Sequence, residues 1–388
     1  MKPLRLVIVT QRFWPSVGGA ENLLGNLAAG LAADGCRVTL LTARWRPAWP
    51  EEICFHEVSV IRLSPPPEEG WPTLRYQRSL ARWLRHNPDR YDLACVSGLG
   101  HDAYATLCAV RGRVPVVLRA ERAGSHGDCL WQQQATCGRR IRKRCLQAAA
   151  LIAPSETIQR ELQAAGYPVA RIHYAPNGVA LPSPRTAAGR AAARSVLAET
   201  DAVLRMPEGA PLVLCVGSFH RHQGLKLLSA WKPLAARWPG ARLWLAGDGP
   251  DRAALQAAIE DLNLSGRAVL IGVFDGVDEL LSAADLFVMP SPEAAESLSL
   301  LEAMAAGLPI VAAGAGDNHA RIADGYQGLL VPAEDAAAMS AAIHRLLDRR
   351  DLAARLGAAA RQRAAQSSLA RMVEQHLTLF EQVIAAER

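Results

Sequence analysis

Short apolar segments alternate with helix-forming segments along this chain, and the alternation occurs in two separate runs. The first run has its apolar segments at 4–10, 37–42, 93–97, 115–119, 151–154 and 171–175. The second has them at 212–217, 242–246, 269–272, 286–289, 310–313 and 328–331. Near-continuous apolar strands are typical of parallel sheets that helices cover on both faces. The pattern predicts an α/β protein with two doubly wound, Rossmann-like domains that face each other across a cleft.

The two runs also predict where the domains begin and end. A chain of 388 residues suits two domains rather than one. Residues 1–180 form the expected amino-terminal domain and 211–369 the carboxyl-terminal domain. Between them, residues 181–210 are rich in Pro, Ala, Arg and Gly and are interpreted as a linker with one short helix.

Charge and hydropathy limit the classes of partner and location. The formal charge is +6, which favours anionic ligands. No apolar run approaches the ~20 residues of a membrane span, and 4–10 is too short for a signal-peptide core, so we expect a cytoplasmic protein. The densest basic run, Arg139–Arg144, is interpreted as a solvated helix. The alternative for that run is peripheral contact with the inner face of a membrane or with an anionic acceptor.

Eight cysteines are scattered without a Cys-x-x-Cys pair. Cys129, Cys137 and Cys145 are evenly spaced near His126, but zinc ligands usually pair two to four residues apart. We therefore expect reduced thiols and no metal or other cofactor.

The segment 289–311 carries the strongest local signal. It predicts a buried strand ending at Met289, a Pro/Ser turn with acids, a helix to Ala306, and a new strand after the stop at Gly307. In open α/β sheets such a turn lies at the carboxyl end of a strand, where ligands bind. The free amides at the start of the helix suit a phosphate.

This segment resembles the signature of the retaining family 4 glycosyltransferases of the GT-B fold, in which Pro-Ser-x-x-Glu precedes Glu-Ala-Met-Ala-x-Gly. Glu302 matches the second glutamate. The place of the first falls on Ala294, with Glu293 one residue before it and Glu296 two after. Further segments that resemble the family, in the same order, are 13–21, Pro-Asn-Gly-Val at 176–179, 245–250 and 283–290.

The resemblance implies roles for particular residues. Glu302 would bind the ribose of a nucleotide sugar, and the amides of Ser297, Leu298 and Ser299 its diphosphate, so that no metal is needed. Glu293 or Glu296 would contact the donor sugar. Further donor-binding residues expected on this basis are Gly18, Gly19, Gly217, Ser218, Arg221, Gln223, Gly247 and Val273.

The acceptor, a glycan, lipid or small molecule, would bind to the amino-terminal domain. There His126 is the expected catalytic histidine, with His101 as the alternative. The last helix, about 370–388, packs back on that domain in the resembled family. A role in nucleic-acid binding is not expected.

The chain departs from the family at the loop after the first strand of the second domain. The family has Gly-Arg-x-x-x-x-Lys-Gly there, and this chain has Ser218 and Gln223 in place of the two cations. His220, Arg221, His222 and Lys226 are the nearby candidates to replace them. A charge-assisted hydrogen bond is about twice as strong as a neutral one. Losing both cations would therefore remove positive charge that stabilises the bound diphosphate.

The function expected from the resemblance is transfer of a sugar from a nucleotide sugar to a hydroxyl with retention, in glycan or lipopolysaccharide biosynthesis. A second possibility is a GT-B protein with weak or no activity that binds a sugar nucleotide or a partner transferase. An epimerase or phosphorylase of the same fold lacks the Glu-Ala-Met-Ala-x-Gly helix. A dinucleotide dehydrogenase is disfavoured because no Gly-x-Gly-x-x-Gly follows either first strand.

Overall fold

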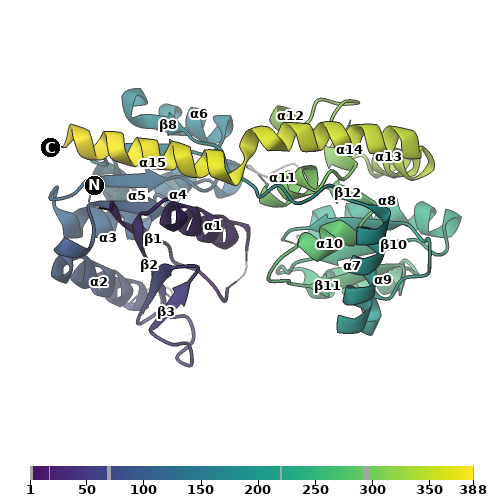
Figure 1. Cartoon of the computed structure of the whole chain (residues 1–388), viewed down its shortest axis with the longest axis horizontal. Coiled ribbons are helices and arrows are strands. Elements are labelled where there is room, and N and C mark those ends of the chain that lie inside the picture. The colour runs from purple at the N-terminus through teal and green to yellow at the C-terminus, as the bar shows by residue number, and fades with distance from the viewer. Residues whose placement is uncertain (1–2, 17, 68–70, 219–220, 292–296, 388) are drawn as a thin grey trace. The chain divides into compact units, whose positions relative to one another are not determined.

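The structure, a computed structural model, describes residues 3–16, 18–67, 71–218, 221–291 and 297–387. Of Trp71, Pro72 and Arg221 it describes the backbone alone. The chain divides into two compact units (Figure 1). The first comprises Met1–Gly178 with Leu369–Arg388, and the second comprises Val179–Ser368.

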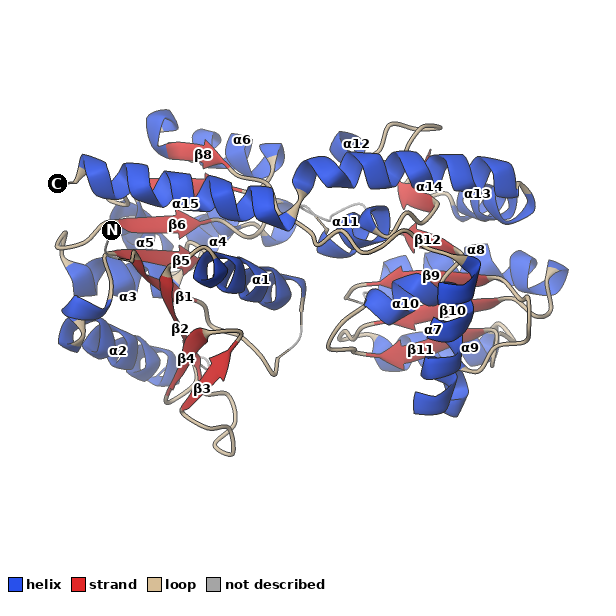
Figure 2. Cartoon of the chain, in the orientation of Figure 1, coloured by secondary structure: helices blue, strands red, loops and turns tan. Residues whose placement is uncertain are grey.

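The first unit contains an eight-stranded sheet in the order β3-β4-β2-β1-β5-β6-β7-β8 (Figure 2). All strand pairs are parallel except β3 with β4. The strands are β1 (Arg5–Val9), β2 (Arg37–Ala43), β3 (Glu52–Phe55), β4 (Val58–Leu63), β5 (Leu93–Ser97), β6 (Val116–Arg119), β7 (Ala150–Ala153) and β8 (Ile172–Tyr174). The hairpin of β3 and β4 extends the sheet and has no counterpart among the strands expected from the sequence.

Helices of the first unit pack on this sheet and on one another. They are α1 (Gly19–Ala33), α2 (Trp71–His86), α3 (His101–Val110), α4 (Asp128–Gln134), α5 (Gly138–Cys145), α6 (Glu156–Ala164) and α15 (Leu369–Ala386). The chain's last helix, α15, lies beside its first, α1, within this unit (Figure 1). Close packing explains Gly30, since a Cβ there would lie 2.4 Å from a methyl carbon of Val373 on α15.

The second unit contains a six-stranded parallel sheet in the order β11-β10-β9-β12-β13-β14. The strands are β9 (Leu212–Val216), β10 (Arg242–Ala246), β11 (Ala268–Gly272), β12 (Leu286–Met289), β13 (Ile310–Ala313) and β14 (Leu329–Val331). The helices are α7 (Ala187–Thr200), α8 (Arg221–Arg237), α9 (Arg252–Asp261), α10 (Asp278–Ala283), α11 (Leu298–Ala305), α12 (Asn318–Arg321), α13 (Ala336–Asp348) and α14 (Arg350–Ala364).

Both faces of this second sheet are buried, which is why its strands are apolar at nearly every position. Along β10, Leu243 and Leu245 join one apolar layer with α8 and α13, whereas Trp244 joins the other layer. All three side chains are fully buried. The alternation is the packing of a sheet covered on both faces.

The packing of α7 corrects the expected linker at 181–210. This helix contacts α10, and Leu197 on it belongs to the second unit's apolar layer. Leu204, four residues after the end of α7, is buried in the same layer. The composition rich in Pro, Ala, Arg and Gly predicted a linker, but one buried leucine is enough to dock this helix against α10 within the unit.

None of the helices in the described part of the chain is both long and apolar enough to cross a membrane. The basic run forms α5 as expected, although it is only partly solvated. Arg139 and Lys143 are exposed, whereas Arg142 donates to the Ala165 carbonyl and Arg144 donates to Gln147 Oε1 at 2.7 Å.

Candidate functional site

The carboxyl ends of β9 and β12 meet at one edge of the second sheet, and α11 begins there. Ser297 caps α11, and its Oγ accepts a hydrogen bond from the Leu300 amide at 3.3 Å. Ser299 Oγ donates to the Val216 carbonyl at the end of β9, at 3.0 Å. These two serines fix the start of the helix against the end of the neighbouring strand.

The first amides of α11 have no acceptor inside the helix, as at any helix start. Ser297 satisfies the amide of Leu300, and within the described part of the chain those of Leu298 and Ser299 are the ones left at the carboxyl edge. The positive end of the helix dipole lies at the same place. The arrangement can bind an anion such as a phosphate.

Glu302 lies one turn into α11 and is half-buried. Burial raises the pKa of this carboxyl to about 8, and the charge of Asp278 at the start of α10 adds to the effect. The pKa of Asp278 is itself raised, by burial and by Glu279. At neutral pH the Glu302 carboxyl is therefore largely protonated and can both donate and accept a hydrogen bond.

Two glycines at this edge allow the ends of β9 and β10 to approach closely. Gly217 has φ +159° and Gly247 φ +132°. A Cβ on Gly247 would lie 2.0 Å from the Gly217 carbonyl oxygen. The sequence singled out Gly247 as a ligand-binding residue, and the structure gives it a packing reason.

The cations proposed to replace the missing Arg and Lys are held elsewhere. Lys226 is 8% exposed, and its Nζ is 2.7 Å from Glu334 Oε1. His222 Nε2 is 2.8 Å from the other oxygen of Glu334. Two of the four candidates to replace the missing cations therefore already contact a carboxylate.

The remaining residues discussed for this site lie partly inside and partly outside the described chain. Glu293, Ala294, Glu296 and His220 lie outside the described residues. Arg221 begins α8 and Gln223 is half-buried on the same helix, whereas Ser218 is exposed in the loop before it. Val273 is 54% exposed, just after the end of β11.

The two glycines expected to bind the donor lie at the carboxyl edge of the first sheet, at the start of α1. Gly18 is the N-cap of α1, and Gly19 is its first residue. Gly18 has an extended backbone with φ −172°, so its conformation does not itself require glycine. A Cβ there would lie 2.3 Å from a carboxylate oxygen of Glu21, which turns back over the start of the helix.

The two candidate histidines differ in their surroundings. His126 is exposed in the short 3₁₀ turn Gly124–His126 that follows β6. His101 is half-buried at the start of α3, with its ring edge-on to Trp131 at a centroid distance of 5.2 Å. Burial lowers the pKa of His101, which favours its neutral form at physiological pH.

Asp128 and Arg119 organise this edge, and sequence reasoning gave neither a role. The Asp128 carboxylate accepts from the amides of Glu121 at 2.7 Å and Arg122 at 3.2 Å. Arg119 is fully buried and donates to Glu121 and to Asn177. A charged residue at the end of an apolar strand was the available signal for Arg119.

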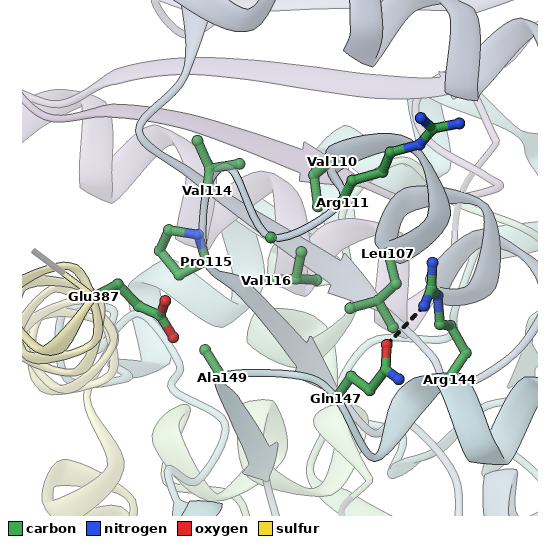
Figure 3. Close-up of a pocket in the computed structure, with 11 residues that line it drawn as sticks. Leu107, Val110, Arg111, Val114, Pro115, Val116, Arg144, Gln147, Ala149 and Glu387 are labelled. Atoms are coloured by element: carbon green, nitrogen blue, oxygen red, sulfur yellow. Dashed lines mark hydrogen bonds between the residues drawn. The ribbon is translucent and has the colours of Figure 1, made fainter.

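A cavity of about 380 Å³ in the first unit lies away from this edge (Figure 3). It is lined at the amino ends of β6 and β7 by Val116 and Ala149, with Arg144 and Glu387 at its sides. It contains none of the residues expected at the site. Among the residues whose placement is described, no group of three or more His, Cys, Asp and Glu side chains could hold a metal ion.

Sequence comparison identifies a family for each unit. Residues 17–181 match the profile described as Glycosyltransferase Family 4, and residues 210–349 match Glycosyl transferases group 1. The chain therefore carries a family 4 glycosyltransferase domain followed by a group 1 glycosyl transferase domain. Its fold is GT-B, since it superposes on HepE of Anabaena, solved with UDP and glucose, with a TM-score of 0.76. That alignment covers 97% of this chain and 99% of HepE at 20% identity.

Two curated relatives show what kinds of glycosyltransferase this chain is similar to. The lipopolysaccharide core biosynthesis glycosyltransferase LpsE of Rhizobium meliloti is 35% identical over 42% of this chain and 46% of its own length. The GDP-mannose-dependent alpha-(1-6)-phosphatidylinositol monomannoside mannosyltransferase of Mycobacterium tuberculosis is 26% identical over 92% of this chain and 93% of its own length. The matched region spans less than half the length of the first curated relatives.

Proposed function

We propose that this protein transfers a sugar from a nucleotide-sugar donor to an acceptor hydroxyl with retention of the anomeric configuration. The observation that carries the proposal is the start of α11 at the carboxyl edge of the second sheet, with Glu302 one turn further on. Membership of the glycosyltransferase family supports it. The second unit would bind the donor, and the first unit would bind the acceptor.

In this proposal the amides of Leu298 and Ser299 bind the donor's diphosphate. As the glycosidic bond breaks, negative charge grows on the leaving diphosphate, and preorganised helix amides stabilise that charge. The reaction then needs no metal ion. The ribose hydroxyls bind to Glu302, whose protonated carboxyl offers both a donor and an acceptor.

Retention would follow from attack on the face that the diphosphate leaves. A donor phosphate oxygen takes the proton of the acceptor hydroxyl, and the new bond forms on the same face as the broken one. His126 or His101 would contact the sugar, and the half-buried neutral His101 is the better placed to donate or accept a hydrogen bond. Glu293 and Glu296 remain predictions for contacts with the donor sugar.

Relatives support a nucleoside diphosphate without fixing its base. HepE was solved with UDP, and the mycobacterial relative is named for GDP-mannose. Both bases therefore belong in a first test. A glycan or lipid acceptor is proposed from the names of LpsE and of the mycobacterial relative, and the cytoplasmic location stays a prediction from the sequence.

One observation favours a second candidate, a protein that binds sugar nucleotides without transfer. Glu334 pairs with Lys226 and contacts His222, and neutral side chains occupy positions 218 and 223. A diphosphate would then be held by the helix amides alone among the groups described at this edge.

A binding test comes first. Full-length protein is heated with UDP, GDP or ADP, and then with the matching nucleotide sugars. A ligand bound only by the native state raises the melting temperature, by an amount that grows with its concentration above Kd. We expect one base to give a shift, and Glu302→Ala to weaken binding of that nucleotide by roughly tenfold or more in calorimetry.

Glu260→Ala is the matched control, because Glu260 is an exposed helix acid on α9. Equal nucleotide affinity in Glu302→Ala and Glu260→Ala would remove the ribose role. Transfer is tested by nuclear magnetic resonance of the product formed with the binding donor, with and without EDTA. An inverted product, or activity lost with EDTA, would contradict retention or metal independence. Binding without product from any acceptor tried would favour the second candidate.

A further inference from the structure

Two neighbouring loops at the carboxyl edge of the first sheet are rich in tryptophan and arginine. The loop after β1 carries Arg12 and Trp14, and the loop after β2 carries Trp45, Arg46 and Trp49. We call these five residues the tryptophan–arginine surface. It contains three of the chain's nine tryptophans. Because β1 and β2 are adjacent in the sheet, residues more than 30 positions apart come together.

Hydrogen bonds hold the two loops in place. Trp45 Nε1 donates to the Gln11 carbonyl at 2.8 Å. Beneath the surface, Arg62 on β4 is 3% exposed and donates to the carbonyls of Pro50 and Trp14, both at 2.9 Å. Bonds from a buried guanidinium to carbonyls of both loops make their relative position part of the folded unit.

Positive charge on this surface is little offset. Arg12 and Arg46 are exposed, and neither forms an ion pair with any residue that the structure describes. The Arg12 guanidinium lies 5.1 Å from the centre of the Trp45 ring. Glu21 interacts electrostatically with Arg12 without reaching ion-pair distance.

Trp49, the second tryptophan of the loop after β2, is also flanked by cations. Arg46 and Arg62 lie 5.9 Å and 5.6 Å from the centre of the Trp49 ring. Burial lowers the pKa of Arg62, and the nearby Arg44 lowers it further. Arg44 pairs with Glu51 at 2.8 Å. The remaining guanidinium groups favour a negatively charged ligand.

The combination of indole rings and guanidinium groups matches a particular ligand chemistry. An indole presents a flat apolar face, which suits the C–H face of a sugar ring. A guanidinium pairs bidentately with a carboxylate or a phosphate. A sugar that carries such an anionic group satisfies both at once.

We propose that the tryptophan–arginine surface binds an anionic sugar residue of the acceptor, one that carries a carboxylate or a phosphate. The proposal rests on the transferase function proposed above and adds the class of acceptor. A lipid surface fits less well. Trp14 is 44% exposed, but Trp45 and Trp49 are half-buried and tied to the loops, so they do not protrude as inserting side chains would.

The test measures binding of model saccharides to the full-length protein by calorimetry. The probes are tetragalacturonate and glucose 6-phosphate, which carry carboxylates and a phosphate, and maltotetraose, which is neutral. We expect at least one anionic probe to bind and maltotetraose to bind at least tenfold more weakly. The combined change Arg12→Ala with Arg46→Ala should weaken anionic binding by roughly tenfold or more.

A matched control removes two exposed cations of α5, Arg139→Ala with Lys143→Ala, and should leave binding unchanged. Vesicles of phosphatidylcholine with phosphatidylglycerol test the lipid alternative. The proposal is overturned if neither anionic probe binds, if maltotetraose binds equally well, or if both double variants lose the same affinity. It is also overturned if the vesicles alone bind through Arg12 and Arg46.

The nucleotide experiment separates this inference from the proposed function. Melting shifts with UDP and GDP are measured in the same double variants, in which the donor-binding unit is untouched. A retained nucleotide shift without saccharide binding sinks the acceptor inference alone. If the unaltered protein shows no shift in melting temperature with UDP or GDP, the proposed transferase function is contradicted instead.

Discussion

The carboxyl edges of the two sheets have opposite chemistry on the same type of scaffold. The first edge carries Arg12 and Arg46 beside indole rings. The second carries exposed Asp248 after β10, exposed Asp275 after β11 and the half-buried Glu302 on α11, with glycine and serine at the strand ends. One fold can thus present a cationic, aromatic surface and an acidic, backbone-lined one, because the loops at the strand ends are free to vary while the strands stay apolar.

One buried group in each unit should make a pH-dependent contribution to stability, and the two contributions have opposite sign. The first buries a neutral base, His376 on α15, which is 0% exposed. The second half-buries an acid, Glu302. A buried base penalises low pH and a buried acid penalises high pH, so His376 and Glu302 are expected to lower stability at opposite ends of the pH range.

The largest effect tests the backbone contact of the second edge. Gly247→Ala would place a Cβ 2.0 Å from the Gly217 carbonyl oxygen, at a backbone φ of +132°. We expect the second unit to lose about 4 kcal/mol of unfolding free energy, measured by hydrogen exchange of its peptides. Gly276→Ala is the control, since no atom lies within 4 Å of the added Cβ. Equal exchange in both variants would disprove the close approach.

A pH titration tests the first unit. Burial, with a smaller effect from Arg119, lowers the pKa of His376 to about 4. Between its ordinary value near 6.5 and pH 4, the unfolded chain takes up a proton that the folded unit refuses, so stability falls with pH by about 3 kcal/mol. His376→Leu should flatten this loss in exchange of α15 peptides, whereas exposed His86→Gln should not. An unchanged slope in His376→Leu would contradict the buried neutral state.

The contribution of Glu302 to the stability of the second unit should change with pH in the opposite direction. Since burial raises the pKa of Glu302 to about 8, its stability falls as pH rises from about 4.5 to 8. Part of the side chain faces solvent, so we expect about 2 kcal/mol rather than the full linkage value. Glu302→Gln should remove the loss and make the unit more stable than the unaltered protein at pH 9. A variant that is less stable at pH 9 than at pH 5, by as much as the unaltered protein, would contradict this assignment.

The smallest expected effect concerns the bond that fixes α11 to β9. Ser299→Ala removes the hydrogen bond to the Val216 carbonyl and should cost about 1 kcal/mol in the second unit. The control Ser229→Ala removes an exposed hydroxyl that bonds within its own helix at 2.8 Å, and should cost less. If nucleotide affinity also falls in Ser299→Ala alone, the position of α11 matters for binding as proposed.

Much of the fold could be predicted from the sequence because buried parallel strands are apolar at most positions. The expected segments 93–97, 242–246, 286–289 and 310–313 coincide with β5, β10, β12 and β13. The hairpin of β3 and β4 was missed, since Glu52–Phe55 is a short edge strand with exposed positions and depends on β4 for its pairing. The linker was wrong because packing of α7 depends on α10, about 80 residues later.

The candidate site divides in the same way. Local chemistry was visible in the sequence: a cap at Ser297, an acid one turn on, and a glycine stop at Gly307. Partners distant in sequence were not visible. Glu334 lies more than 100 positions from Lys226 and His222, and only the packing of α8 beside α13 brings them together.

The sequence by itself determined that this chain forms two parallel-sheet domains of the GT-B type and where the helix with Glu302 begins, because strand burial and helix capping are local properties. Tertiary structure decided which cations are free. It paired Lys226 with Glu334 and laid the loops of Trp14 and Trp49 over Arg62, leaving Arg12 and Arg46 exposed. The charge that a ligand meets depends on contacts between distant residues, since a paired cation attracts an anion far less than an unpaired one.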